Sequence, residues 1–89
     1  MQLLKVISET AGTIFRIERK VGDTVAEGEV ILILESMKME IEILAEKKGI
    51  IKSVLVNEGD LVQEGHHLAN IETSYLIRAL ISIKLTLLY

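Results

Sequence analysis

The sequence predicts an all-β domain, a flattened β-barrel or β-sandwich with pseudo-two-fold symmetry. Three observations predict it: an internal repeat, short runs of β-forming residues, and glycines at the boundaries between those runs. Short strands at regular spacing, separated by turn residues, are typical of sandwiches and barrels. The chain has 89 residues, which is the size of one small domain.

The internal repeat has a constant offset of 37 positions and relates residues 3–35 to residues 40–72 without gaps. Glycines and acidic residues match along with the apolar positions: Gly12 with Gly49, Gly22-Asp23 with Gly59-Asp60, and Glu27-Gly28 with Glu64-Gly65. Two similar halves in one small domain predict a pseudo-two-fold axis between them.

Each half contains four predicted strands. Residues 30–34 form a continuous apolar run rich in β-branched side chains, and residues 39–43 alternate between apolar and polar with period two. Both patterns indicate strands, and glycine marks the turns between them. The strands are expected near residues 3–7, 12–18, 24–26, 30–35, 40–44, 49–55, 61–63 and 67–72.

Composition excludes several classes of function. The net charge of −3 and the lack of a basic stripe argue against nucleic-acid binding. The chain has no cysteine, which excludes disulfides and thiolate chemistry. His66 and His67 are the only histidines, and neighbouring side chains on a strand point to opposite faces, so no metal site is predicted. No set of nucleophile, base and orienting group is visible, so no catalytic residue is predicted and the chain is not expected to be an enzyme.

The last part of the chain differs from the repeat. We expect residues 1–74 to form the domain and residues 75–89 to form an apolar tail, in which 11 of 15 residues are apolar. This tail is too short, and too interrupted by Arg78 and Lys84, for a membrane span. Its alternating residues 81–87 fit an added strand, a partner-docking or self-association segment, or a disordered end. No secretory signal is visible at the start, which favours a cytoplasmic protein.

The junction between the two halves is the candidate site. Residues 36–39 connect two apolar strands, which predicts a tight hairpin with Lys38 on a protruding tip. Met37 and Met39 flank it, and methionine side chains suit a surface that another protein grips. Other readings remain open: Lys38 fits an ordinary solvated turn, and strand alternation points one methionine into the core.

The segment Glu35-Ser36-Met37-Lys38-Met39-Glu40 resembles the attachment motif of biotinyl domains, which carry Met-Lys-Met at a hairpin tip. The resemblance covers residues 3–72 and includes the flanking turns at residues 22–28 and 59–65. It implies the family's fold, a barrel-sandwich hybrid of two four-stranded antiparallel sheets. Ser36 stands where many members have alanine, and Ala11 and Glu46 stand near positions where many have proline. The thumb segment of some carboxyl carrier proteins has no counterpart between the halves.

The resemblance implies that a biotin protein ligase joins biotin to the amine of Lys38. Residues near this lysine would be recognised by the ligase, namely Met37 and Met39 as the flanking motif and Glu35, Ser36 and Glu40 as further contacts. Glu35 and Glu40 also fit solvated strand ends. A biotin carboxylase would then use ATP and bicarbonate to carboxylate the biotin, and the domain would carry the carboxyl group to a carboxyltransferase.

Two other functions compete with this one. The first is a lipoyl carrier, or a carrier that accepts either lipoate or biotin on Lys38, because lipoyl domains share the fold. Lipoyl domains usually have Asp-Lys-Ala at the tip, so Met-Lys-Met favours biotin. The second is a β-sandwich interaction module whose Lys38 is never modified.

Overall fold

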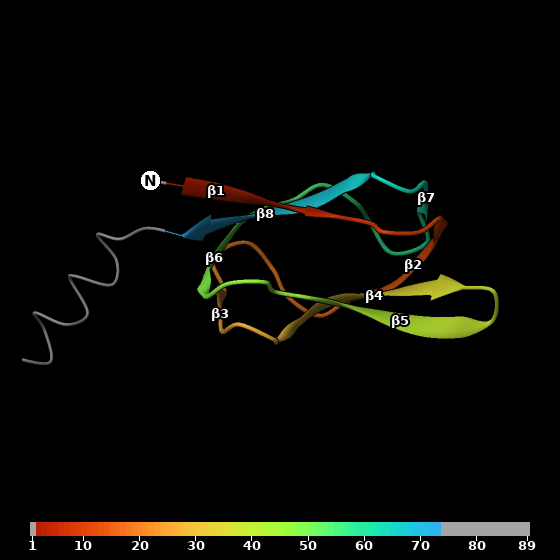
Figure 1. Ribbon diagram of the computed structural model, residues 1–89, viewed down its shortest axis with the longest axis horizontal. Coiled ribbons are helices and arrows are strands. Elements are labelled where there is room, and N and C mark those ends of the chain that lie inside the picture. Colours follow the sequence, from red (N-terminus) through yellow and green to blue (C-terminus); the bar gives the residue numbers. More distant parts are fainter. Residues whose placement is uncertain (1, 74–89) are drawn as a thin grey trace, which may run out of the picture.

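The computed structural model describes residues 2–73, which form eight strands and no helix (Figure 1). Every predicted strand is confirmed, and each boundary lies within one residue of the expected range. The strands are β1 (Gln2–Ile7), β2 (Gly12–Ile17), β3 (Thr24–Val25), β4 (Val30–Ser36), β5 (Met39–Leu44), β6 (Gly49–Val54), β7 (Leu61–Val62) and β8 (His67–Thr73).

The strands form two four-stranded antiparallel sheets in two layers (Figure 1). The strand order is β1-β8-β6-β3 in the first sheet and β5-β4-β2-β7 in the second. Replacing each strand by its repeat equivalent, β1 by β5 and β4 by β8, converts the first order into the second. The predicted pseudo-two-fold symmetry is therefore confirmed, and each sheet takes two strands from each half.

The symmetry extends to the register of the strand pairs. Leu34 faces Ile41 between β4 and β5, and the equivalent residues Ile71 and Leu4 face each other between β8 and β1. Both pairs of strands also have an irregularity at the same place, which leaves Ile31 and Leu68 without a cross-strand partner. A bulge bends its strand and increases its twist, so the repeat reproduces the curvature of the sheets as well as their order.

The expected choice between a flattened barrel and a sandwich is settled in favour of the sandwich. β1 and β5 are each the last strand of a sheet and do not pair with each other. On the opposite side the two sheets are closed by loops. There Gly22 donates its backbone N–H to the carbonyl oxygen of Ile51 at 2.9 Å, and Gly59 donates to that of Ile14 at 2.7 Å. Both glycines have φ above +90°, a conformation that L side chains rarely adopt.

The core lies between the two sheets and is built from equivalent pairs of residues. Burying one valine, leucine or isoleucine side chain completely contributes roughly 1.5–3 kcal/mol to the stability of the fold. The buried pairs are Ile14 and Ile51, Val25 and Val62, Ile31 and Leu68, Leu32 and Ala69, and Leu34 and Ile71. Strand alternation places Ile14, Leu34 and their equivalents inward. The bulges in β4 and β8 place two successive side chains inward, Ile31 with Leu32 and Leu68 with Ala69.

The start of β1 and the end of β8 lie at the end of the sandwich opposite the β4–β5 hairpin (Figure 1). Gln2 pairs with Thr73 at one end, and the equivalent residues Met39 and Ser36 pair at the other. The predicted tail, residues 75–89, lies outside the described residues. Within residues 2–73, no helix is long and apolar enough to cross a membrane.

Candidate functional site

The β4–β5 hairpin has a two-residue loop, which is shorter than the four-residue junction visible in the sequence. Ser36 and Met39 form the last cross-strand pair, so Met37 and Lys38 alone make the turn. Both have positive φ, 51° for Met37 and 65° for Lys38. Positive φ at both central residues is the signature of a type I′ turn, whose twist matches that of the flanking strands.

This turn is built from residues that do not favour it. Type I′ turns prefer Asn-Gly or Gly-Gly, whereas an L residue with a β-carbon in the left-handed region costs roughly 1–2 kcal/mol. No other non-glycine residue among those described has positive φ. Strained backbone of this kind persists where the surrounding structure enforces it, and it is concentrated at functional sites.

Two contacts hold the base of the hairpin. The Ser36 hydroxyl donates a hydrogen bond to the carbonyl oxygen of Ala11 at 2.9 Å, which ties β4 to the loop between β1 and β2. Gly12 lies so close to β4 that a β-carbon on it would be 2.5 Å from the carbonyl oxygen of Glu35. The hairpin therefore projects from a rigid base formed by β2.

Lys38 occupies the outermost position of this hairpin and is exposed. The ion pairs among residues 2–73 join Arg16 to Glu18, Arg19 to Glu29 and Lys52 to Glu72, and none includes Lys38. Its amine is thus not held by a carboxylate of the described chain. A primary amine on a long, flexible, exposed stem can reach into the site of another protein.

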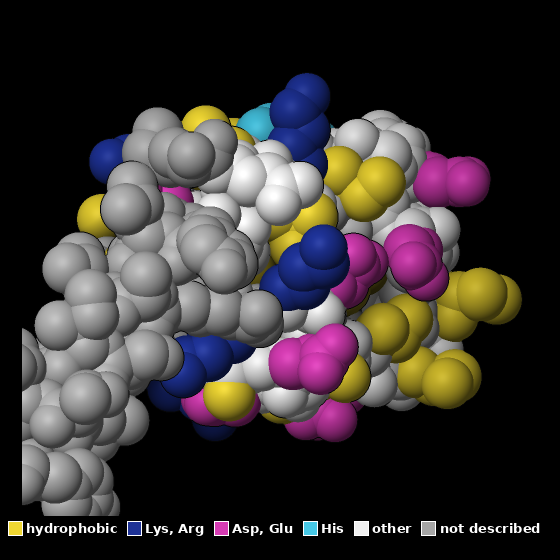
Figure 2. Space-filling model, turned by 60° about the vertical axis from the view of Figure 1, so that its left-hand side comes forward, with side chains coloured by type: hydrophobic (Ala, Val, Ile, Leu, Met, Phe, Trp, Pro, Cys, Tyr) yellow, Lys and Arg dark blue, Asp and Glu magenta, His cyan; other side chains and the backbone are white. Residues whose placement is uncertain are grey.

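Both methionines beside this lysine are exposed, Met37 by 92% and Met39 by 64%. The expectation that one of them packs in the core is wrong. Strand alternation does not apply across the turn, because Met37 lies in the loop and Met39 is the first residue of β5. Figure 2 shows hydrophobic side chains at the hairpin end of the molecule with acidic side chains beside them. Exposed, adaptable methionine side chains are typical of binding surfaces.

The two acidic residues of the motif form one row with residues of β2 and β7. Glu35 faces Glu40 across the β4–β5 pair and faces Thr13 of β2 on its other side. Thr13 in turn faces Leu61 of β7, which is 79% exposed. Residues directly opposite each other in a sheet share a face, so this row presents two carboxylates and one leucine near Lys38.

Leu61 was not singled out by the sequence analysis. A signal for it exists in the repeat, because the equivalent position in the other half is the polar Thr24, whereas residue 61 is apolar and exposed. Comparing the two halves for differences, as well as for matches, would have found it.

The two histidines lie apart from the hairpin motif. His66 is exposed in the loop before β8, and His67 is the first residue of that strand. The Nε2 atom of His67 is 2.8 Å from the Oδ1 atom of Asn70, whose Nδ2 group donates to the Ser53 hydroxyl at 2.7 Å. This network gives the half-buried histidine a structural partner. Residues 2–73 contain no cluster of three potential metal ligands.

Comparison with known proteins gives consistent matches. Residues 5–71 match the family described as biotin-requiring enzymes, the biotin/lipoyl domain family. The biotin/lipoyl attachment protein of Bacillus subtilis is 42% identical over 71 residues, which are 80% of this chain and 97% of that protein. A dihydrolipoyllysine-residue succinyltransferase component of the 2-oxoglutarate dehydrogenase complex, from Staphylococcus saprophyticus, is 42% identical over 62 residues, 70% of this chain and 15% of that protein.

The fold is shared with a domain of a much larger solved structure. The urea carboxylase of Kluyveromyces lactis matches with a TM-score of 0.77 and 32% identity, over 81% of this chain and 6% of that one. These relatives include a carboxylase and a lipoyl-bearing transferase. The matches therefore define the type of domain, one to which biotin or lipoate is attached.

Proposed function

This chain belongs to the biotin/lipoyl attachment family, and from that premise we propose that it is a carrier domain with biotin attached to Lys38. Domains of this type carry a group for other proteins and do not catalyse a reaction themselves. The observation that carries the proposal is the position of Lys38 at the tip of a strained two-residue turn, exposed and outside the ion pairs of the described residues.

The local structure suits attachment by another enzyme. In the proposed reaction a biotin protein ligase uses ATP to activate the carboxyl group of biotin and joins it to the Nζ atom of Lys38 as an amide. Pyrophosphate and AMP are released, and the Nζ atom loses a proton. The exposed side chains of Met37 and Met39, on either side of Lys38 in the sequence, offer the ligase an apolar contact surface. Glu35 and Glu40 offer acidic contacts, and the Ser36 hydroxyl holds the base of the turn in place.

Bound biotin would supply the ring that holds a carboxyl group. The domain would extend this ring toward a biotin carboxylase and then toward a carboxyltransferase. Tethering raises the effective concentration of the group at both sites. The carboxylase partners are supported by the relatives in which this domain is one part of a larger carboxylase, such as urea carboxylase.

Lipoate on the same lysine is the second candidate, and the succinyltransferase relative is the observation that favours it. The Met-Lys-Met tip argues for biotin, because lipoyl domains usually carry Asp-Lys-Ala there. A domain whose Lys38 accepts either biotin or lipoate would serve as both kinds of carrier.

Intact mass spectrometry after co-expression tests the proposal directly. With a biotin protein ligase and biotin, we expect a mass increase of one biotinyl group, lost in Lys38→Ala and in Lys38→Arg. Lys48→Ala removes an exposed lysine between β5 and β6 and serves as the matched control, which should still be modified.

Co-expression with a lipoate ligase is the second arm of the test. Lipoylation without biotinylation would replace biotin by lipoate in the proposal. Failure of both ligases to modify Lys38 would contradict both carrier functions and favour the unmodified interaction module.

A further inference from the structure

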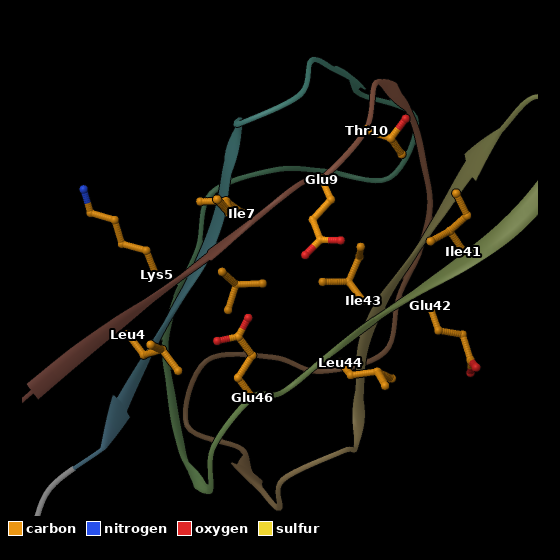
Figure 3. Close-up of a pocket in the computed structure, with 11 residues that line it drawn as sticks. Leu4, Lys5, Ile7, Glu9, Thr10, Ile41, Glu42, Ile43, Leu44 and Glu46 are labelled. Carbon is orange, nitrogen blue, oxygen red and sulfur yellow. The ribbon is translucent and has the colours of Figure 1, made fainter.

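A groove lies between the edge strands β1 and β5 (Figure 3). β1 pairs with β8 and β5 pairs with β4, and neither edge strand has a second partner strand among residues 2–73. Each edge therefore presents a row of backbone N–H and C=O groups to which another strand can be added. The volume of the groove is about 230 Å³.

Part of the groove lining is apolar. Ile7 and Leu44, which are equivalent in the internal repeat, lie across the groove from each other and are 48% and 45% exposed (Figure 3). Leu4, Ile41 and Ile43 also line the groove, where they pack against the core but are only partly buried. Covering such surface removes it from water, which favours binding. An occupant of the groove should therefore contribute apolar side chains.

Carboxylates surround this apolar surface. The side chains of Glu9 and Glu46 extend over the groove from its two sides (Figure 3). Glu42 is the third acidic residue of the lining and Lys5 is its one cation, which gives the lining a formal charge of −2. The ion pairs among residues 2–73 include none of these three carboxylates. An occupant with positive charge would therefore be attracted to the groove.

Size and charge select one kind of occupant. Pockets that enclose a drug-sized molecule usually have volumes of roughly 300–1,000 Å³, and this groove is smaller, so it fits a few side chains of a larger partner. A second copy bound through the same groove would form a two-fold interface. That interface would bring two negatively charged linings together, and like charges repel. A positively charged segment of a different protein satisfies both conditions.

We propose that the groove binds an extended, basic segment of a partner protein by strand addition. The segment pairs with β5, because Glu42 and Glu46 lie on this side of the groove whereas β1 carries Lys5. Its backbone hydrogen bonds to the edge of β5 supply affinity, and its alternate side chains supply specificity. On its inner face, apolar side chains cover Ile7 and Leu44, and a lysine or arginine lies beside the carboxylates.

The groove is separate from the attachment site. Lys38 is not among the residues that line it, so a partner bound there leaves the amine at the hairpin tip exposed. The groove would thus hold the domain on a partner protein while the tip reacts elsewhere. The inference does not depend on which group Lys38 carries.

Titration of the full chain with a synthetic peptide tests the proposal, with Lys38→Arg to prevent modification of the tip. The probe is acetyl-Thr-Val-Thr-Lys-Thr-Val-Thr-amide, in which valine, lysine and valine share one face of a strand. The control peptide has glutamine in place of lysine. Changes in backbone amide chemical shifts, measured by NMR, give the Kd and locate the bound peptide.

Two double variants isolate the role of charge. Glu9→Gln with Glu46→Gln removes two carboxylates of the groove. Glu27→Gln with Glu64→Gln removes another pair related by the repeat, exposed and outside the lining, with the same change in net charge. We expect the first variant to raise the Kd of the lysine peptide about threefold to tenfold. The second should raise it by less than about twofold, because charges far from the peptide are screened by salt.

The chemical shifts should change mainly at residues 4–9 and 41–46, and the glutamine peptide should bind more weakly than the lysine peptide. Absence of saturable binding would overturn the proposal, as would equal effects of the two double variants or shift changes confined to residues outside β1 and β5. Sedimentation velocity supplies a further check. A dimer that dissociates in Ile7→Thr with Leu44→Thr would make a second copy the occupant and contradict the proposal.

Discussion

Glu35 and Glu40 lie directly opposite each other at the end of the β4–β5 hairpin, so two carboxylates face each other beside Lys38. Like charges in this arrangement destabilise a strand pair. The equivalent pair in the other sheet is Glu72 and Leu3, and there the single carboxylate forms an ion pair with Lys52 at 3.7 Å. Of these two equivalent pairs, only the one in the sheet that carries the hairpin tip places two carboxylates opposite each other.

We expect Glu40→Gln to stabilise the fold and to slow modification. Removing one of the two charges should raise the free energy of unfolding by about 0.2–1 kcal/mol. The same change should lower the kcat/KM of a biotin protein ligase if the carboxylate contacts a cation of the ligase. Urea unfolding followed by circular dichroism and a steady-state ligation assay measure the two effects.

Glu72→Gln is the matched control for this change. It removes the equivalent carboxylate of the opposite sheet, so the ligation rate should stay at its wild-type value. If Glu40→Gln also left the ligation rate unchanged, the acidic pair would have no part in recognition.

The strained turn predicts a stabilising substitution. Met37 has φ 51° in the loop, and asparagine tolerates the left-handed region better than methionine does. Met37→Asn should therefore raise the free energy of unfolding by roughly 0.5–1 kcal/mol. Met39→Asn is the comparison, because residue 39 lies in β5, where asparagine is unfavourable. A loss of stability in Met37→Asn would mean that the turn carries no strain at this position.

The sequence predicts the eight strands well because each strand of one half has an equivalent strand in the other half, so each boundary is marked twice. A boundary that is ambiguous in one half is marked in the other by an equivalent glycine, as Gly12 and Gly49 do for β2 and β6. The hairpin position follows equally well, since the junction between the halves contains only four residues.

The details of the tip and of the open side could not be predicted in the same way. Strand alternation places one methionine inside, but the two-residue loop interrupts the alternation and leaves Met37 and Met39 both exposed. Closure between β1 and β5 depends on how the twisted sheets diverge. That divergence is a property of the assembled layers and has no local sequence pattern.

Glycines of two kinds should respond differently to substitution by alanine. At Gly12 the added β-carbon would meet the backbone of Glu35 at 2.5 Å, and backbone atoms cannot move aside cheaply. We expect a loss of roughly 1–3 kcal/mol from this overpacking, together with weaker modification because the base of the hairpin shifts.

Gly22→Ala provides the contrast. No atom lies within 4 Å of its β-carbon position, so only the positive φ opposes the change, at a cost of about 1 kcal/mol. Modification should be unaffected, since this turn lies away from the hairpin. Equal ligation rates in the two alanine variants would contradict the role given to Gly12.

The two buried bulge residues, Ile31 and Leu68, should contribute equally to the free energy of unfolding. Ile31 and Leu68 are both fully buried and both occupy the unpaired position of a bulge. Ile31→Ala and Leu68→Ala should each lower the free energy of unfolding by about 2–5 kcal/mol. Thermal unfolding followed by circular dichroism measures both. A much smaller loss in one of them would show that the two halves of the core are not equally packed.

The pairing of Gln2 with Thr73, at the end opposite Lys38, has a consequence for gene fusion. The first and last described strands begin and end side by side there, and the length of β4 separates that end from the lysine by about 20 Å. A polypeptide joined directly before Gln2 or directly after Thr73 would therefore start at the end of the sandwich opposite the tip. A domain with this arrangement can therefore work as a short separate chain or as one domain of a long enzyme.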